Sequence, residues 1–228
     1  MKTLGLVGGI SWTSTLDYYR RLNEGVNRRL GGLESARCIV YSINFGELQR
    51  LTWPNAHGLL RDACRRLVAG GAEGIALGAT TAHLFADTLE AELEVPFVNL
   101  CVETAKAVRA RGLSKVALLG TKFTMEMDFF RDTLARHGVE AVVPDTQAVR
   151  DYIQQTVRDE LGAGIVRAET KAAYLGIVEE LVQRGARGVI LGCTELPMML
   201  GAADFAVPVF DTVEIHAEAM VRFALGEP

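Results

Sequence analysis

The sequence predicts an α/β protein built from two pseudo-symmetric parallel-sheet domains, and three observations support that prediction. Residues 71–81 (GAEGIALGATT) match residues 185–195 (GARGVILGCTE) at a shift of 114 residues. Other pairs, among them 95–99 with 207–211, match at a shift of 112 residues. Strand patterns also alternate with helical patterns, which favours parallel strands joined by right-handed helical crossovers. We therefore expect an internal duplication, with the active site in the cleft between the two domains.

Each expected element has its own apolar spacing. Strand patterns lie at residues 3–8, 36–43, 74–77, 96–100, 115–119, 139–143, in the apolar run before Cys193, and at 207–211. Helical patterns lie at residues 14–29, 57–70, from about 80 to 92, from 101 onward, and at 125–136, 146–161, 168–184 and 213–225. The repeat divides these elements into a first domain, residues 1–98 plus 213–228, and a second domain, residues 99–212.

Composition excludes several classes of protein. The 228 residues are 49% hydrophobic, which is enough for a proper core, and the net charge is −4. That charge gives no electrostatic reason to expect nucleic acid or an anionic membrane as partner. The longest apolar runs are strand-sized, so we expect no membrane span. Residues 1–8 resemble a strand rather than a signal peptide, and we expect a cytoplasmic protein.

The cysteines indicate neither a metal site nor a disulfide framework. Cys38, Cys64, Cys101 and Cys193 are scattered, without a C-x-x-C pair or histidine-rich spacing. Cys38 lies within a strand pattern and Cys64 on the apolar face of a helix, so both are predicted core residues, and Cys101 is expected to pack at a helix start.

Cys193 stands apart because it follows a buried strand and precedes Thr194 and Glu195. A helix N-terminus at this place would lower the pKa of the thiol and favour the reactive thiolate. Thr194 could hold a carboxylate, and Glu195 could orient or shuttle a proton. The alternatives are a core cysteine and a solvated acid in the first turn of a helix.

Two turns of the first half also carry polar groups. Ser11 follows Gly8-Gly9 at the start of a helix, and it belongs either to an anion cradle or to a capped tight turn. Thr80 or Thr81 is placed to cap the helix after the 74–77 strand. His83 follows, and either local hydrogen bonding or a ligand contact would explain it.

Four motifs together resemble the cofactor-independent aspartate/glutamate racemase family, in particular its broad-specificity branch. They are Gly8-Gly9-Ile10-Ser11-Trp12-Thr13-Ser14-Thr15, Gly120-Thr121-Lys122-Phe123-Thr124-Met125-Glu126, Gly192-Cys193-Thr194-Glu195 and Pro208-Val209-Phe210-Asp211-Thr212. The resemblance covers essentially the whole chain. It implies two similar α/β domains, a homodimer, an amino-acid substrate, and no cofactor or metal.

The family's mechanism, as the resemblance implies it, uses two cysteines on opposite faces of the substrate α-carbon. Cys193 matches the second cysteine, with Glu195 as its catalytic neighbour. Ala79 occupies the position of the first, or Gly78 in an alignment shifted by one residue, and neither side chain can transfer a proton. The residues matched to substrate binding are Ser11, Thr80, Thr81, Thr121, Thr124 and Thr194.

Three functions follow from this departure. The first is an amino-acid racemase with Cys193 as the remaining acid/base, and racemisation would be slow. The other face would be served by water, by Thr80 or Thr81 relaying a proton to His83, or not at all. The second is a one-cysteine lyase on the same fold, a decarboxylase or an eliminase, because such reactions need one protonating thiol. The third is a catalytically inactive amino-acid-binding protein.

Overall fold

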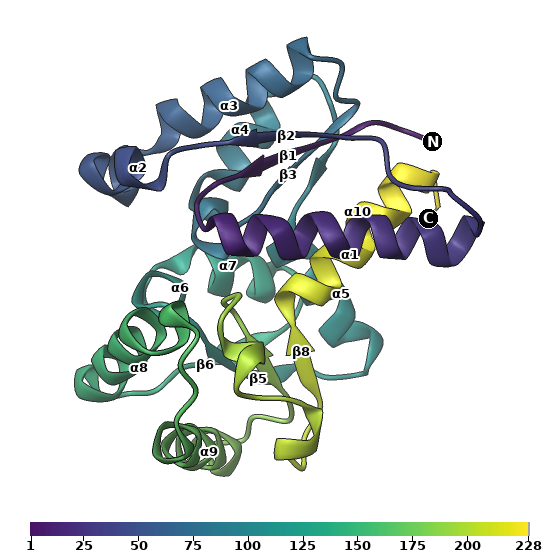
Figure 1. Ribbon diagram of the computed structural model, residues 1–228. Helices are drawn as coiled ribbons and strands as arrows, with labels where there is room; N and C mark the ends of the chain where they lie inside the picture. Colours follow the sequence, from purple (N-terminus) through teal and green to yellow (C-terminus); the bar gives the residue numbers. More distant parts are fainter. Residues whose placement is uncertain (228) are drawn as a thin grey trace. The chain divides into compact units, whose positions relative to one another are not determined.

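The computed structural model describes residues 1–227 and divides into two compact units (Figure 1). Unit 1 comprises Met1–Glu103 and Val213–Pro228, and unit 2 comprises Thr104–Thr212. The first crossing between the units falls inside helix α5 (Leu100–Ala110), whereas the sequence repeat places that boundary at 98/99.

Each unit contains a four-stranded parallel sheet, as the repeat predicts. In unit 1 the order is β2-β1-β3-β4, with β1 at Leu4–Gly8, β2 at Cys38–Ser42, β3 at Gly74–Leu77 and β4 at Phe97–Val98. In unit 2 the order is β6-β5-β7-β8, with β5 at Lys115–Leu119, β6 at Glu140–Val142, β7 at Val189–Leu191 and β8 at Val209–Asp211. The two orders are equivalent, so the prediction of two parallel α/β sheets is confirmed.

The duplication extends to individual backbone hydrogen bonds. At the end of β3 the N–H of Gly78 donates to the carbonyl of Val7 at 2.8 Å, and at the end of β7 the N–H of Gly192 donates to that of Leu119 at 2.7 Å. These donors and acceptors are related by the 114- and 112-residue shifts seen in the sequence. Two further pairs of backbone bonds are equivalent in the same way. The N–H of Ile75 donates to the carbonyl of Pro96 as that of Val189 does to Pro208, and the N–H of Glu73 donates to Thr3 as that of Arg187 does to Lys115.

Helices cover both faces of the unit 1 sheet. They are α1 (Trp12–Leu30), α2 (Phe45–Leu51), α3 (His57–Ala69), α4 (Ala86–Glu92) and α10 (Thr212–Leu225), with 3-10 turns at Trp53–Asn55 and Thr80–Phe85. Side chains alternate along each strand, so β1 and β3 place Val7 and Leu77 against α3 and α4. Leu6 and Ala76 face the opposite way and pack against α1 and α10.

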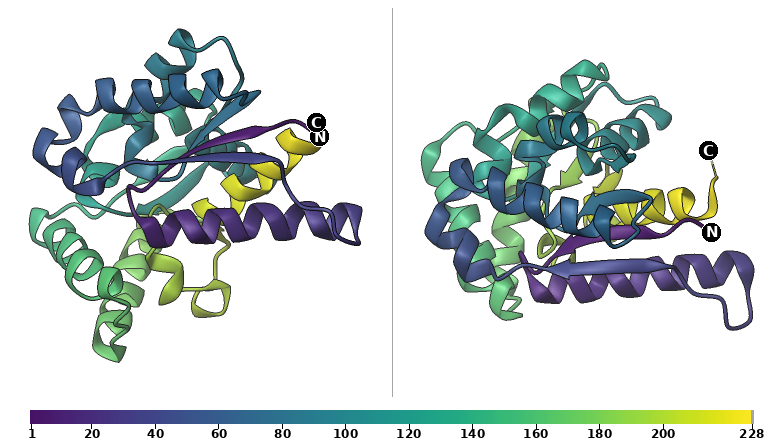
Figure 2. Two further views of the ribbon diagram at one scale, coloured as in Figure 1. Left: turned by 45° about the horizontal axis from the view of Figure 1, so that its top comes forward. Right: turned by 90° about the horizontal axis from the view of Figure 1, so that it is seen from above.

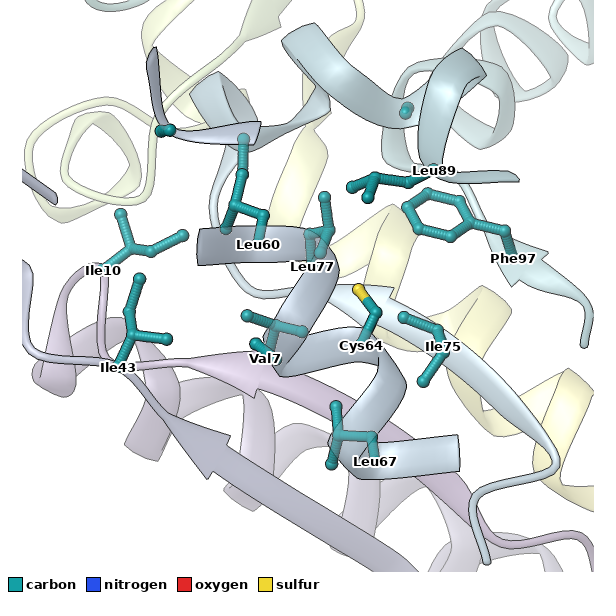
Figure 3. Close-up of a cluster of buried hydrophobic side chains, with 14 of the residues drawn as sticks. Val7, Ile10, Ile43, Leu60, Cys64, Leu67, Ile75, Leu77, Leu89 and Phe97 are labelled. Carbon is teal, nitrogen blue, oxygen red and sulfur yellow. The ribbon is translucent and has the colours of Figure 1, made fainter. Parts of the chain in front are cut away.

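The core beneath α3 is almost wholly aliphatic (Figure 3). Leu60, Cys64 and Leu67 extend from α3 toward Val7 and Ile75. Burial raises the pKa of the Cys64 thiol to about 12, so this thiol stays neutral and packs as a small apolar group.

Unit 2 places two helices on one face of its sheet. Its helices are α6 (Lys122–Glu126), α7 (Asp128–Arg136), α8 (Gln147–Asp159) and α9 (Ala168–Gln183), with 3-10 turns at Leu161–Ala163, Leu196–Met198 and Ala202–Asp204. Apolar residues of α8 and α9 pack on Leu119 and Leu191 in one buried cluster that also contains Cys193. The prediction of one helix over 125–136 is wrong, because Met127 has extended backbone angles (φ −82°, ψ 148°) and separates α6 from α7.

Helix α10 returns the chain to unit 1, where the two chain ends lie near each other (Figure 2). The N–H of Lys2 donates to the carbonyl of Ala224 at 2.8 Å. Within residues 1–227, no helix combines the length and the hydropathy that a bilayer span requires.

Candidate active site

The end of β7 brings a thiol and a carboxylate together. Cys193 is buried, with 4% of its surface exposed, while Thr194 and Glu195 are half-buried. The Glu195 carboxylate lies near enough to raise the pKa of the Cys193 thiol, and the backbone N–H groups of Glu195 and Leu196 act on the thiol in the opposite sense. This turn therefore places a proton donor and a proton acceptor within electrostatic reach of each other.

The electrostatics of this thiol differ from the sequence-based expectation. A helix N-terminus was expected to lower its pKa, but only the three-residue turn Leu196–Met198 follows, which is too short for a substantial dipole. Burial raises the pKa of Cys193, and the negative charge of Glu195 raises it further. The two backbone N–H groups oppose this shift and are outweighed. The expected low pKa is therefore wrong, and Cys193 rests as a neutral thiol.

The loop after β5 lies against this turn. Thr121 caps α6: its hydroxyl accepts from the N–H of Thr124 at 3.3 Å and lies 3.1 Å from the Thr124 hydroxyl. The Thr124 methyl group fills the space beside Gly120 and Gly192, where an added Cβ would lie 2.9 Å and 3.1 Å from it. The fold thus brings Thr124, and Thr121 through it, next to the backbone that leads into Cys193.

In unit 1, the equivalent turn at the end of β3 has hydroxyls but no thiol. Ala79 is half-buried and extended, and Thr80 and Thr81 are buried behind it. The Oγ1 atom of Thr80 is enclosed, yet it has no hydrogen-bond partner among the described residues. A buried hydroxyl without a partner costs about 1–3 kcal/mol, so a ligand that bound it would recover that cost.

The backbone favours Ala79 over Gly78 as the counterpart of Cys193. A Cβ atom added at Gly78 would approach the carbonyl oxygen of Val7 to 3.2 Å, which is tighter than ordinary contact. Ala79 already carries a Cβ atom and is more exposed than its neighbours on either side. The position in the repeat and the available space therefore agree.

His83 is held by backbone groups on both sides of its ring. Its Nε2 atom accepts from the N–H of Leu100 at 3.1 Å, so its Nδ1–H donates to the carbonyl of Ala79 at 3.0 Å. Burial lowers its pKa to about 3, which keeps the ring neutral. These bonds favour a structural role for His83 over the predicted proton relay, because neither ring nitrogen is left to exchange a proton.

The turn after β1 depends on glycine. Gly9 has φ +82°, and a Cβ atom there would lie 2.1 Å from the carbonyl oxygen of Ile43. Its N–H donates to the Thr15 hydroxyl at 2.9 Å, while Ser11 caps α1 and accepts from the N–H of Ser14 at 3.4 Å. Ser11 thus acts as a helix cap here, which is one of its two predicted roles.

Sequence reasoning missed a second buried histidine close to this site. His216 on α10 accepts from the Tyr18 hydroxyl at 3.0 Å and donates to the carbonyl of Val98 at 2.8 Å. Its ring lies 5.5 Å from that of His83, centroid to centroid. A single histidine among the apolar residues of α10 gives no such signal, because its partners come from α1 and β4.

Fold and site together define a duplicated α/β protein that carries hydroxyl-rich turns at its strand ends and one thiol–carboxylate pair. The chain belongs to the Asp/Glu/Hydantoin racemase family, whose model matches residues 7–220.

Three similar proteins illustrate this membership. A candidate Asp/Glu racemase from Yersinia pestis is 40% identical, with a TM-score of 0.93 and coverage of 99% of this chain and 100% of that one. An aspartate racemase homologue from Pyrococcus horikoshii is 36% identical, with a TM-score of 0.86 and coverage of 99% and 100%. The broad-specificity amino-acid racemase RacX of Bacillus subtilis is 27% identical over 169 residues, which are 72% of this chain and 70% of RacX.

Proposed function

We propose that this family member is a cofactor-independent amino-acid racemase that uses Cys193 as the acid/base at the substrate α-carbon. The observation that carries the proposal is the Cys193 thiol itself, buried just after β7, with the Glu195 carboxylate near enough for its charge to raise the pKa of that thiol. Because burial holds the resting thiol neutral, it needs a partner to take its proton before it can act as a base. Glu195 lies two residues along the chain and is half-exposed, so it can take that proton and pass it to water.

Hydroxyl groups are proposed to hold the substrate carboxylate. In unit 2 these are Thr121, Thr124 and Thr194, and in unit 1 they are Ser11, Thr80 and Thr81. The Oγ1 atom of Thr80 supports this role, because it has no hydrogen-bond partner among the described residues and its bonding capacity is unused.

The opposite face of the α-carbon has no thiol, since Ala79 stands at the equivalent strand end. A positioned acid or base contributes about 10²- to 10⁴-fold to a rate, so interconversion of enantiomers should be slow. Exchange on the face that Cys193 serves should be faster than interconversion.

The test is proton NMR of L- and D-amino acids incubated with the protein in D₂O. One enantiomer should exchange its α-proton with retention of configuration, and conversion should lag behind exchange. Cys193→Ser should abolish that exchange, whereas Cys38→Ser, which changes a cysteine on the edge strand β2, should not. Equal exchange in wild type and Cys193→Ser would overturn the proposal.

A second candidate is a one-cysteine lyase, and the resting state of Cys193 favours it. A neutral thiol facing a carbanion formed by decarboxylation or elimination donates its proton directly, without prior deprotonation. The outcome that selects this candidate is a stereospecific product without interconversion of enantiomers. Ligand-induced stabilisation without any exchange or turnover would select the inactive binding protein instead. The homodimer and the cytoplasmic location stay predictions.

A further inference from the structure

A polar stripe on α8 contacts the short helix α6, which contains Thr124 and is capped by Thr121. Gln147, Arg150, Asp151 and Gln154 are spaced i, i+3, i+4 and i+7, so they lie on one face of α8. All four hydrogen-bond to α6, and we call them the α8 stripe.

The stripe holds both ends of α6. At the N-terminal end, the N–H of Lys122 donates to Gln154 Oε1 at 2.8 Å, and Lys122 Nζ pairs with Asp151 at 2.8 Å. At the C-terminal end, Glu126 Oε1 accepts from Arg150 Nε at 3.0 Å and from Gln147 Nε2 at 2.9 Å. The bond from Gln154 also satisfies one of the N–H groups that a helix start leaves unpaired.

Arg150 is the central member of the stripe. Its side chain is 17% exposed, against 40% for Lys122 and 53% for Asp151, so solvent screens its pair with Glu126 less. It also donates to the carbonyl of Pro144 at 2.6 Å and to that of Asp145 at 2.7 Å. These bonds fix the orientation of the guanidinium group that pairs with Glu126.

A five-residue helix cannot hold its position alone, because helices shorter than about 12–15 residues are marginal in water. The position of α6 in turn sets the Thr121 hydroxyl and the Thr124 methyl group that packs beside Gly192. Any shift of α6 would therefore move the Thr124 methyl group relative to Gly192, the residue before Cys193.

We infer that the residues of the α8 stripe are positioning residues. Chiefly through Arg150 and Gln154, they hold α6 so that Thr121 and Thr124 are placed to bind the substrate carboxylate. This inference rests on the proposed function. It assigns a role to residues that lie outside every motif of the resemblance and that reach the site only through α6.

The test compares Arg150→Met with Arg158→Met, a matched control on the same helix. Within the described residues, Arg158 pairs only with its neighbour Asp159, and both side chains are exposed (69% and 46%). Arg150→Met should raise KM for the exchanging amino acid by roughly 10- to 100-fold, because small misplacements of binding groups are costly, while kcat changes less. Arg158→Met should leave both parameters unchanged.

A double-mutant cycle tests whether Arg150 acts through Glu126. The Glu126→Gln and Arg150→Met double variant should have the same KM as Arg150→Met alone. Additive increases in KM would mean that Arg150 acts by another route and would overturn the inference. Should Arg150→Met fail to fold, Gln154→Leu provides the same comparison from the other end of α6.

Hydrogen–deuterium exchange separates failure of this inference from failure of the proposed function. Independently of any activity, Arg150→Met should speed amide exchange in residues 122–127 by roughly tenfold, and it should leave β5 unchanged. Unchanged exchange in 122–127 overturns the stripe as a holding device. Faster exchange with unaltered KM overturns its role in positioning. If wild type exchanges no α-proton at all, the proposed function fails, and the amide exchange still reports on the stripe.

Discussion

The ends of β3 and β7 occupy equivalent places in the two units, and the same backbone hydrogen bond from glycine closes each strand. Beyond that bond they differ. After β7 comes a buried thiol whose pKa the charge of Glu195 raises, followed by a three-residue turn. After β3 come Ala79, two buried threonines and His83, all within or beside a six-residue 3-10 helix.

The difference teaches that duplication preserved the backbone of each strand end and left the side chains free to diverge. Main-chain bonds depend little on side-chain identity, so both turns keep their geometry. Chemistry depends on single side chains, so one turn has a buried thiol near a carboxylate and the other has a histidine hydrogen-bonded to backbone groups. The asymmetry between the two turns is therefore open to test by substitution.

The largest expected effect comes from removing the asymmetry. Ala79→Cys combined with Thr80→Asn should raise the rate of enantiomer interconversion by about 10²- to 10⁴-fold, because it supplies an acid/base at the second strand end. The measurement is conversion of a pure enantiomer, followed by circular dichroism or chiral chromatography.

Gly78→Cys is the control for the alternative alignment. We expect a poorly folded or inactive protein, since its Cβ atom would press on the Val7 carbonyl at 3.2 Å. If wild type already interconverts enantiomers as fast as the Ala79→Cys variant, a second base other than cysteine exists and the comparison of the two turns loses its meaning. His83→Ala and Thr81→Val would then be the next variants.

The turns after β1 and β5 differ in backbone conformation, and this difference should appear in stability. Gly9 has φ +82°, whereas Thr121 at the equivalent place has φ −61°. Gly9→Ala should lower the free energy of unfolding by more than about 3 kcal/mol, because its Cβ atom would overlap the Ile43 carbonyl. Gly112→Ala, also at positive φ but with open space around it, should cost only about 1 kcal/mol. Equal losses in urea unfolding would contradict this account.

Acid should unfold unit 1 before unit 2. Burial lowers the pKa of His83 to about 3 and that of His216 to about 4, each below the ordinary value of 6.5. The contribution of the two neutral rings to the free energy of unfolding is fully present above about pH 6.5, and it is lost as the pH falls toward these values. For the two rings together we expect a loss of roughly 5 kcal/mol between pH 7 and pH 4.5. The charge of Glu103 favours protonated His216 and so limits how far the pKa of that ring falls.

Tryptophan fluorescence can follow this loss, because both tryptophans, Trp12 and Trp53, belong to unit 1. Amide exchange of β5 and β7 reports on unit 2, whose one histidine, His137, is half-exposed. His216→Gln should make the acid loss shallower. If both units unfolded at the same pH, in wild type and in His216→Gln alike, the buried histidines of unit 1 would not be the cause of the acid sensitivity.

The smallest effect concerns the thiol itself. Burial and the Glu195 charge raise the pKa of Cys193, so labelling with iodoacetamide should be slow at neutral pH and rise only in alkali. Glu195→Gln removes the charge and should speed labelling at a fixed pH by up to about tenfold, one pKa unit. Labelling that is fast at pH 7 in wild type would show that the backbone N–H groups of the turn, rather than burial, determine the pKa of the thiol.

Sequence alone was sufficient for the repeat, the parallel sheets and the place of Cys193. Apolar strand runs and a fixed shift between matching segments are local signals that survive without coordinates. The assignment of Thr121 and Thr124 to substrate binding came from the family resemblance, and it stays a prediction. The helix at 125–136 was predicted as one piece, since no Gly or Pro marks the break at Met127.

Only the tertiary structure decided the protonation of Cys193, the role of His83 and the existence of the α8 stripe. The pKa of a thiol depends on how much water reaches it, and residues of α8 and α9 from far along the chain exclude that water. Both partners of His83 are backbone groups, which sequence patterns do not distinguish from any other peptide bond. The spacing of Gln147, Arg150, Asp151 and Gln154 is visible in the sequence as a polar helix face. That this face meets α6 rather than solvent is fixed by packing between segments more than twenty residues apart.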